Sequence, residues 1–183
     1  MRTADEMYEY CVKNGYGSGF NKSNSIKHFK VIESALQPNE EVLSVFIGLH
    51  NYQSVSKHDN NYAYALTNKR IIMGQKKVIG ENCQIIAIEN VSDITFSSGL
   101  LFGIVTIDSF REKFNVAIDK ATAKNIYEVV HSVFYNLKKN NQSSTETVQL
   151  SASDKMIEMK KLLDLGIITE DEFQIKKKQI LGL

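Results

Sequence analysis

Three alternating glycines, Gly15, Gly17 and Gly19, give the chain a superficial likeness to a loop that cradles nucleotide phosphates. A dinucleotide-binding fingerprint needs a strand before its glycines and a helix after them, within a parallel unit. Here a helical pattern precedes the glycines, and no lysine–serine pair directly follows the last of them. The spacing therefore predicts a flexible loop and no nucleotide cofactor.

The histidines are the other residues that could do chemistry: His28, His50, His58 and His131. None lies four residues from another on a predicted helix, and no cysteine or carboxylate pair completes a tetrahedral metal site. The sequence also lacks a Ser-His-Asp order and a nucleophile elbow. We therefore expect no catalytic residue, no metal and no cofactor. An approach of His50 and His58 across the loop between them is the one arrangement that could still assemble a site.

Basic side chains gather between residues 57 and 77, in or beside the links of the first three predicted strands, against Asp59 alone. This basic rim consists of Lys57, Lys69, Arg70, Lys76 and Lys77. Lysines beside an anionic phosphate surface gain about 1 kcal/mol each, so the rim is a candidate site for an anionic ligand. The alternative is a solvated hairpin edge, where lysines discourage edge-to-edge pairing. The polar, mostly neutral stretch Asn51–Ser56 favours that alternative.

The overall charge excludes some classes of protein. The chain has 22 Lys+Arg against 21 Asp+Glu, a net charge of +1, which argues against a dedicated nucleic-acid binder with a strong global field. Its 183 residues, 43% of them hydrophobic, are enough for one domain with an appendage.

The sequence also suggests a location. Cys11 and Cys83 lie far apart, which does not suggest a disulfide scaffold and fits the cytosol. The polar stretch Met1–Glu6 lacks the pattern of a secretory signal, and the longest apolar stretch, Gly99–Ile107, is too short to span a bilayer. We expect a cytoplasmic protein that is peripheral to a membrane at most.

Hydrophobic periodicity divides the chain into helical and extended parts. Residues 1–37 predict two helices, the first opened by a Thr3–Glu6 capping box and the second running from about Ser25 to Pro38. Seven short extended segments with hairpin-length links then predict an antiparallel sheet or barrel: 41–48, 62–66, 70–74, 83–88, 91–96, 102–108 and 111–117. A helix capped by Asp119 follows, with an apolar face from Ile126 to Leu137.

The remaining residues predict a linker and a small tail. Residues 140–153 are polar and weakly patterned, whereas 154–183 predict two short helices separated at Gly166. Helices this short rarely fold alone, so their apolar residues need a surface to pack on. The candidate assembly surface is Met159, Leu162, Leu163, Ile167, Ile168, Phe173, Ile180 and Leu181. The alternative is that this surface docks within the same chain and merely completes the fold.

Two segments resemble known families. The stretch Tyr64–Ile72 is similar to the strand-turn-strand signature of the YokE-like bacterial pleckstrin-homology (PH) domains, a likeness that covers about residues 40–137. The stretch Leu162–Phe173, with Lys176 and Lys177 after it, resembles the SHOCT module, a short C-terminal helical hairpin.

Together these resemblances imply an α+β chain. Its centre would be a PH-like seven-stranded antiparallel roll capped by a C-terminal helix, with N-terminal helices and a C-terminal helical hairpin. The expected parts are an N-terminal helical extension (1–37), the PH-like domain (38–139), the linker (140–153) and the SHOCT-like hairpin (154–183).

The resemblances lead to three hypotheses for function. The first is a non-enzymatic interaction or assembly protein, whose SHOCT-like tail binds a second copy of the chain or another protein. The second is a peripheral module that binds anionic lipid through the basic rim. The third is a phage or mobile-element factor that inhibits a bacterial protein, because both modules resemble proteins common in prophages.

Overall fold

The computed structural model describes residues 1–16, 21–146, 160, 163 and 169–181. The chain divides into two compact units, Met1–Asn140 and Asn141–Leu183. Most residues of the expected first tail helix, including Met159 and Leu162, lie outside the described residues, as do Ile167 and Ile168.

Two N-terminal helices form as the sequence predicts. Helix α1 (Ala4–Lys13) has the expected capping box, in which the Thr3 side chain accepts from the Glu6 backbone N–H and the Glu6 carboxylate accepts in return. Helix α2 (Lys22–Ala35) begins earlier than expected because the Asn21 side chain caps it. Both helices belong to the first compact unit.

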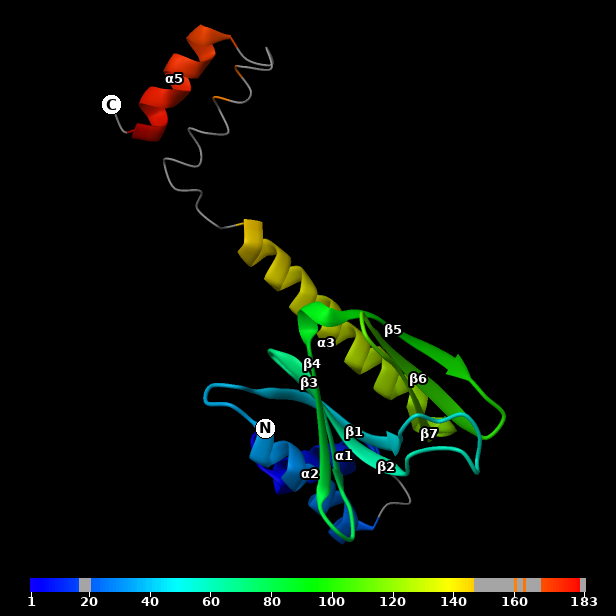
Figure 1. Ribbon diagram of the computed structural model, residues 1–183. Coiled ribbons are helices and arrows are strands. Elements are labelled where there is room, and N and C mark those ends of the chain that lie inside the picture. Colours follow the sequence, from blue (N-terminus) through cyan, green and yellow to red (C-terminus); the bar gives the residue numbers. More distant parts are fainter. Residues whose placement is uncertain (17–20, 147–159, 161–162, 164–168, 182–183) are drawn as a thin grey trace. The chain divides into compact units, whose positions relative to one another are not determined.

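The predicted seven-stranded antiparallel sheet is confirmed. Its strands are β1 (Val42–Leu49), β2 (Asn61–Thr67), β3 (Arg70–Lys76), β4 (Glu81–Ala87), β5 (Val91–Ser98), β6 (Phe102–Ser109) and β7 (Lys113–Asp119). A short 3₁₀ turn, η1 (Ile88–Asn90), connects β4 to β5. The order across the sheet is β4-β3-β2-β1-β7-β6-β5. The pairing between β1 and β7 is brief and joins two hairpin-rich halves, β1–β4 and β5–β7 (Figure 1).

Helix α3 (Lys120–Glu146) follows the last strand. The Asp119 carboxylate accepts from the backbone N–H groups of Ala121 and Thr122 at 2.8 and 3.2 Å, so Asp119 is the expected N-cap. The helix lies along the β5–β7 half (Figure 1) and buries Ala123, Ile126, Val130 and Phe134. A glycine permits this contact, since a Cβ on Gly103 of β6 would come within 2.3 Å of the Ala123 Cβ.

The end of α3 differs from the sequence-based expectation. The segment expected to be a linker begins at residue 140, yet the helix continues to Glu146. Residues 140–146 are polar but contain neither proline nor glycine, so nothing in them stops a helix that is already formed.

The second unit contains helix α5 (Glu170–Leu181). It begins directly after Thr169, as predicted, and the Thr169 carbonyl accepts from the Phe173 backbone N–H at 3.0 Å. The Phe173 side chain is 8% exposed and Leu163 is half-buried. The side chains of Ile180 and Leu181 lie outside the described part of the structure.

Candidate functional site

Arg70, the first residue of β3, lies in an ion pair rather than on an open rim. Its Nε donates to Glu40 Oε1 and one terminal guanidinium nitrogen donates to Oε2, each at 2.8 Å. The same nitrogen donates to the Ala35 carbonyl at the end of α2, also at 2.8 Å. Thr67 donates its hydroxyl to Glu40 Oε1 and accepts from the Arg70 backbone N–H. Arg70 therefore connects the β2–β3 turn to α2.

The electrostatics of Glu40 agree with this structural role. Its side chain is fully buried, and burial by itself would raise the pKa of the carboxyl. Hydrogen bonds from Arg70, Gln37 and Thr67 outweigh that effect and lower the pKa to about 2. The buried carboxylate stays charged and holds the guanidinium in place, so an anionic ligand would have to displace it from Arg70.

The basic rim is not one surface. Lys69 and Arg70 lie at the β2–β3 turn, whereas Lys76 and Lys77 lie at the other end of β3. Lys76 lies six positions along the strand from Arg70, which is about 20 Å. Lys57 lies in the loop between β1 and β2. The expectation of a single anionic-ligand site from these five residues is therefore corrected, because the antiparallel hairpins place them at opposite ends.

The loop between β1 and β2 borders a polar hollow of about 540 Å³. Its lining is Asn51, Gln53, Ser56, Lys57, His58, Asp59, Lys113 and Asn115. Asn51 and Asn60 adopt left-handed backbone conformations at the two ends of the loop, and the Asn51 side chain donates to Asp59 at 2.8 Å. Lys113 pairs with Asp108 at 2.7 Å. Because the lining of the hollow includes both lysines and an aspartate, the hollow favours neither cations nor anions.

His50 does not combine with His58 into a site. The His50 ring is fully buried, stacked on Tyr62, and its Nδ1 lies 2.6 Å from the Tyr64 hydroxyl. Its Nε2 has no hydrogen-bond partner among the described atoms. Burial lowers the pKa of His50, although Asp59 acts in the opposite direction. The His58 Nδ1 instead accepts from the Asn60 backbone N–H at 3.0 Å.

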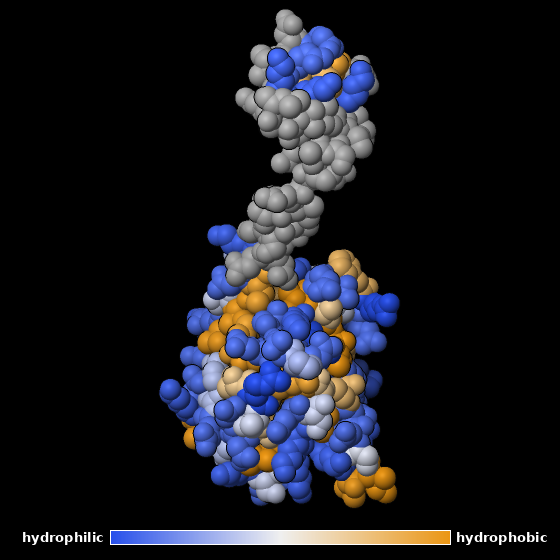
Figure 2. Space-filling view, turned by 90° about the vertical axis from the view of Figure 1, so that its left-hand side faces the viewer, coloured by the Kyte–Doolittle hydropathy of each residue, from blue (hydrophilic) through white to orange (hydrophobic). Residues whose placement is uncertain are grey.

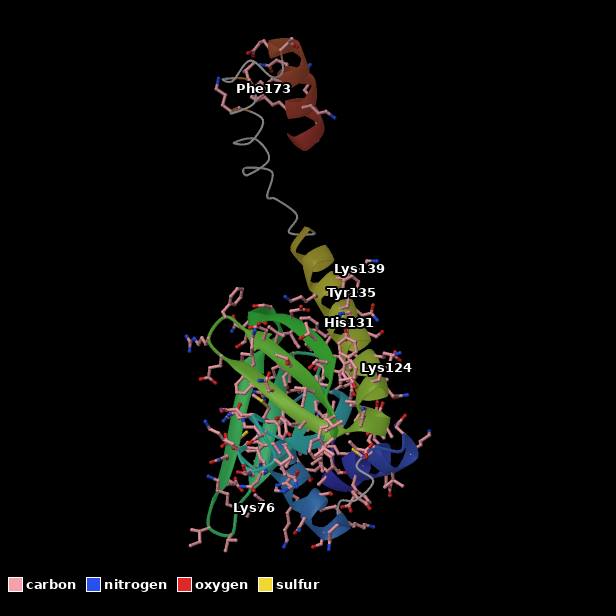
Figure 3. All side chains as sticks on the ribbon, turned by 90° about the vertical axis from the view of Figure 1, so that its right-hand side faces the viewer. Lys76, Lys124, His131, Tyr135, Lys139 and Phe173 are labelled. Carbon is pink, nitrogen blue, oxygen red and sulfur yellow. The ribbon has the colours of Figure 1, made fainter. Side chains whose placement is uncertain are left out.

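A second basic region lies where α2 meets β3 and β4, and the sequence reasoning missed half of it. A hollow of about 150 Å³ there is lined by Lys27, Lys30, Val31, Ser34, Lys76 and Glu81. Lys76 pairs with Glu81 at 3.3 Å. The signal in the sequence was the i, i+3 spacing of Lys27 and Lys30, which places both on one face of a helix. Figure 3 labels Lys76 at this position.

Helix α3 carries a row of rings. Tyr127, His131 and Tyr135 are spaced by four residues, with ring centroids 5.3 and 6.5 Å apart, and Tyr127 also stacks on Phe96 of β5. Figure 3 labels His131 and Tyr135 on the same side of the helix. Tyr135 is exposed, so the row runs from the domain body to solvent.

The described residues offer neither a cluster of metal ligands nor a membrane-spanning helix. Within them, no three His, Cys, Asp or Glu side chains approach closely enough to hold a metal ion. None of the described helices combines the length and the apolar character needed to cross a bilayer.

Comparison with known families decides what the domain is. The family described as bacterial PH domain matches residues 36–132, which is more than half of the chain. This chain belongs to the bacterial PH domain family. The Thr67–Arg70 turn that carried the resemblance lies inside the match, and its structural role is the ion pair with Glu40.

The tail has a family match of its own. The family described as short C-terminal domain, SHOCT, matches residues 154–181. The chain is therefore a PH-like domain with a C-terminal SHOCT module. Helices α1 and α2 precede both matches.

Solved structures with a similar fold include two PH domains. The Vps36 N-terminal PH domain aligns with a TM-score of 0.46 and 16% identity, covering 57% of this chain and 86% of that one. A DUF1696 family protein with a pleckstrin-homology domain from Shewanella loihica aligns with a TM-score of 0.40 and 10% identity, covering 59% and 87%. No curated protein matches the chain.

Proposed function

We infer that the chain is a non-catalytic cytoplasmic assembly protein, in which the PH-like domain is a rigid platform and the SHOCT module binds a second copy of the chain. PH-like and SHOCT domains are typically non-catalytic. The platform has an extensive core that includes both N-terminal helices and the inner face of α3.

The observation that supports this proposal most is the small size of the tail. The SHOCT match spans only residues 154–181, and its described helix α5 has only 12 residues. Isolated helices of that length are marginal in water, and a unit below about 40 residues usually needs help from another surface. A second tail offers such a surface, because the two would bury the same apolar set against each other.

The apolar residues of the tail are the proposed contact. We assign the role to the set predicted from the sequence: Met159, Leu162, Leu163, Ile167, Ile168, Phe173, Ile180 and Leu181. Among those with described side chains, Phe173 is buried and Leu163 is half-buried. The exposed side chains of α5 that the structure describes, Glu170, Gln174, Lys176 and Lys178, are all polar.

Light scattering coupled to size exclusion tests this proposal on the full chain and on a Leu163→Asp variant. We expect the full chain to exceed the monomer mass of 20.7 kDa and the variant to lose the excess, because a carboxylate in an apolar contact is strongly disfavoured. The matched control is Lys178→Asp, which puts the same carboxylate on the exposed side of α5 and should keep the larger mass.

A further inference from the structure

Strands β4 and β5 are the two edges of the sheet, and they differ in how well they are protected. The extra residue Ser92 makes a bulge in β5, and the Asp93 carboxylate accepts from the Ile94 backbone N–H at 2.8 Å. Bulges and charged side chains keep an edge strand from pairing further. Strand β4 pairs with β3 in one continuous register, contains no lysine or proline, and has its charged residue, Glu81, at its first position. The edge of β4 is therefore open to a further strand.

The hydrogen bonds of the β3–β4 hairpin determine which backbone groups of β4 face outward. At one end the Lys77 N–H donates to the Gly80 carbonyl, and at the other the Ile88 N–H donates to the Lys69 carbonyl, each at 3.1 Å. Bonded and non-bonded pairs alternate between these ends, because the strands are antiparallel. The residues whose N–H and C=O groups point to the open edge are therefore Glu81, Cys83, Ile85 and Ala87.

A hollow of about 520 Å³ runs along this edge. Four consecutive residues of β4, 84–87, line it, although the side chains of a strand alternate between its two faces. Such a run lines one hollow only where the hollow borders the edge of the strand itself. Asn90 and residues 109–112, at the β6–β7 turn, complete the lining. The hollow is therefore a slot beside unpaired backbone.

The floor of the slot is apolar and contains an acceptor without a partner. The buried side chains of Met73 and Phe114 line it, together with Ile86. The Gln84 side-chain oxygen is buried and has no hydrogen-bond partner among the described atoms, so a donor entering the slot would satisfy it. Phe110 at the rim is 78% exposed, but apolar groups reach the domain surface in several places (Figure 2), so exposure alone does not mark the site.

The charge and the shape of the slot select its partner. The charged residues of its described lining are Arg111 and Glu112, whose charges cancel, so the slot does not attract lipid headgroups or nucleic acid. The edge strand of a second copy fits less well, because its own neighbouring strand would meet residues 109–112. A single extended segment needs only the width of one strand and has free backbone groups to pair with β4.

We propose that β4 binds an extended, largely apolar peptide segment of another protein, which adds a strand to the sheet and places a side chain in the slot. The backbone of the segment pairs with the outward N–H and C=O groups of Cys83, Ile85 and Ala87. A side chain with a donor bonds to the Gln84 oxygen. This site goes beyond the proposed assembly function and uses no residue of the SHOCT module, so a monomeric full chain would still bind the peptide.

Selection from a phage-displayed library of random peptides of about ten residues, a length that covers an ordinary strand, tests the proposal on the full chain. We expect enrichment of peptides with alternating apolar residues. A fluorescent copy of an enriched peptide should bind with a rise in anisotropy. Hydrogen exchange followed by nuclear magnetic resonance should then slow at the Cys83, Ile85 and Ala87 amides. It should change less at Gln84 and Ile86, whose amides already bond to β3.

A proline substitution removes a single outward N–H. Ile85→Pro deletes a donor at the open edge but no bond to β3, which an edge strand tolerates, and should weaken peptide binding by about tenfold or more. The matched control, Ile85→Ala, keeps the N–H and should weaken binding far less. A peptide N-methylated at alternate residues makes the same test without changing the protein. Gln84→Leu should weaken binding by about fivefold.

Four results would overturn the proposal. One is that no peptide is enriched over a selection without protein. Another is unchanged binding to Ile85→Pro and of the N-methylated peptide. The third is a bound peptide that slows exchange elsewhere but not at Cys83, Ile85 and Ala87. The fourth is an Ile85→Pro protein that binds no less peptide yet loses a dimer, since the edge would then belong to a second copy.

Discussion

At the residue scale, Arg70 is the clearest case of a side chain whose role depends on its partner. A basic residue beside a turn could contact a ligand, but Arg70 is 14% exposed and forms two bonds to a fully buried carboxylate. Its third bond, to the Ala35 carbonyl, ties α2 to the sheet. The neighbouring Lys69 has the same charge but is exposed to solvent. Lys69 and Arg70 therefore have different roles.

Replacement of Arg70 should be costly. Arg70→Ala leaves Glu40 buried without its main partner, and loss of one member of a buried pair typically costs about 3–5 kcal/mol. We expect a lower free energy of unfolding in urea, with Lys69→Ala as the neighbouring control that changes it little. A loss below about 1 kcal/mol for Arg70→Ala would show that the pair does not stabilise the domain.

His50 gives the fold a dependence on pH. Burial lowers its pKa below the usual 6.5, so the folded state favours the neutral ring while the unfolded chain accepts the proton more readily. Its contribution to stability is present above pH 6.5 and is lost as the pH falls below that value. His28, whose pKa is also lowered by burial, acts in the same direction.

The measurement for this prediction is the free energy of unfolding between about pH 7.5 and about pH 5. We expect it to fall towards acid, and to fall less steeply in His50→Phe, which keeps a buried ring but cannot be protonated. His28 accounts for the slope that remains. Parallel curves for the two proteins would contradict the role of His50.

At the scale of elements, periodicity was a good guide to structure. The alternation in Val91–Phe96 predicted β5, the Thr3–Glu6 box predicted the start of α1, and the apolar face from Ile126 to Leu137 predicted α3. Each of these signals comes from residues that are close together in the chain, so it can be recognised in a single sequence. The length of α3 was missed because polarity says little about where a helix stops.

The candidate sites were harder to predict because they depend on partners that are distant in the sequence. Arg70 meets Glu40 across 30 positions, and Lys76 meets His28 across 48. Nothing near either residue indicates those partners. In contrast, the separation of Lys69 from Lys76 can be predicted from the sequence. Lys69 lies in the hairpin turn before the strand, and Lys76 lies at the far end of that strand.

The contact between β6 and α3 can be tested at this scale. Gly103→Ala should destabilise the domain by about 1–3 kcal/mol, because its Cβ would clash with Ala123. In an Ala123→Gly background, the same change should cost less, because the closest clash is removed while Phe96 at 2.9 Å remains. Equal costs in both backgrounds, measured by urea unfolding, would mean that the two positions do not interact.

At the scale of the whole molecule, the chain combines a platform with a complete core and a tail that is too small for one. The family matches follow the same division, with residues 36–132 in the PH-like domain and 154–181 in the SHOCT module. The near-zero net charge conceals the lysines beside the β3–β4 turn, which give the platform a basic end.

The most direct test of assembly through the tail is the solution mass of the full chain, compared with that of a chain ending at Glu146. That end point preserves all of α3, which a cut at residue 140 would shorten. We expect a mass of at least twice 20.7 kDa for the full chain and a monomer for the shorter one. Monomeric mass for both proteins would contradict self-association.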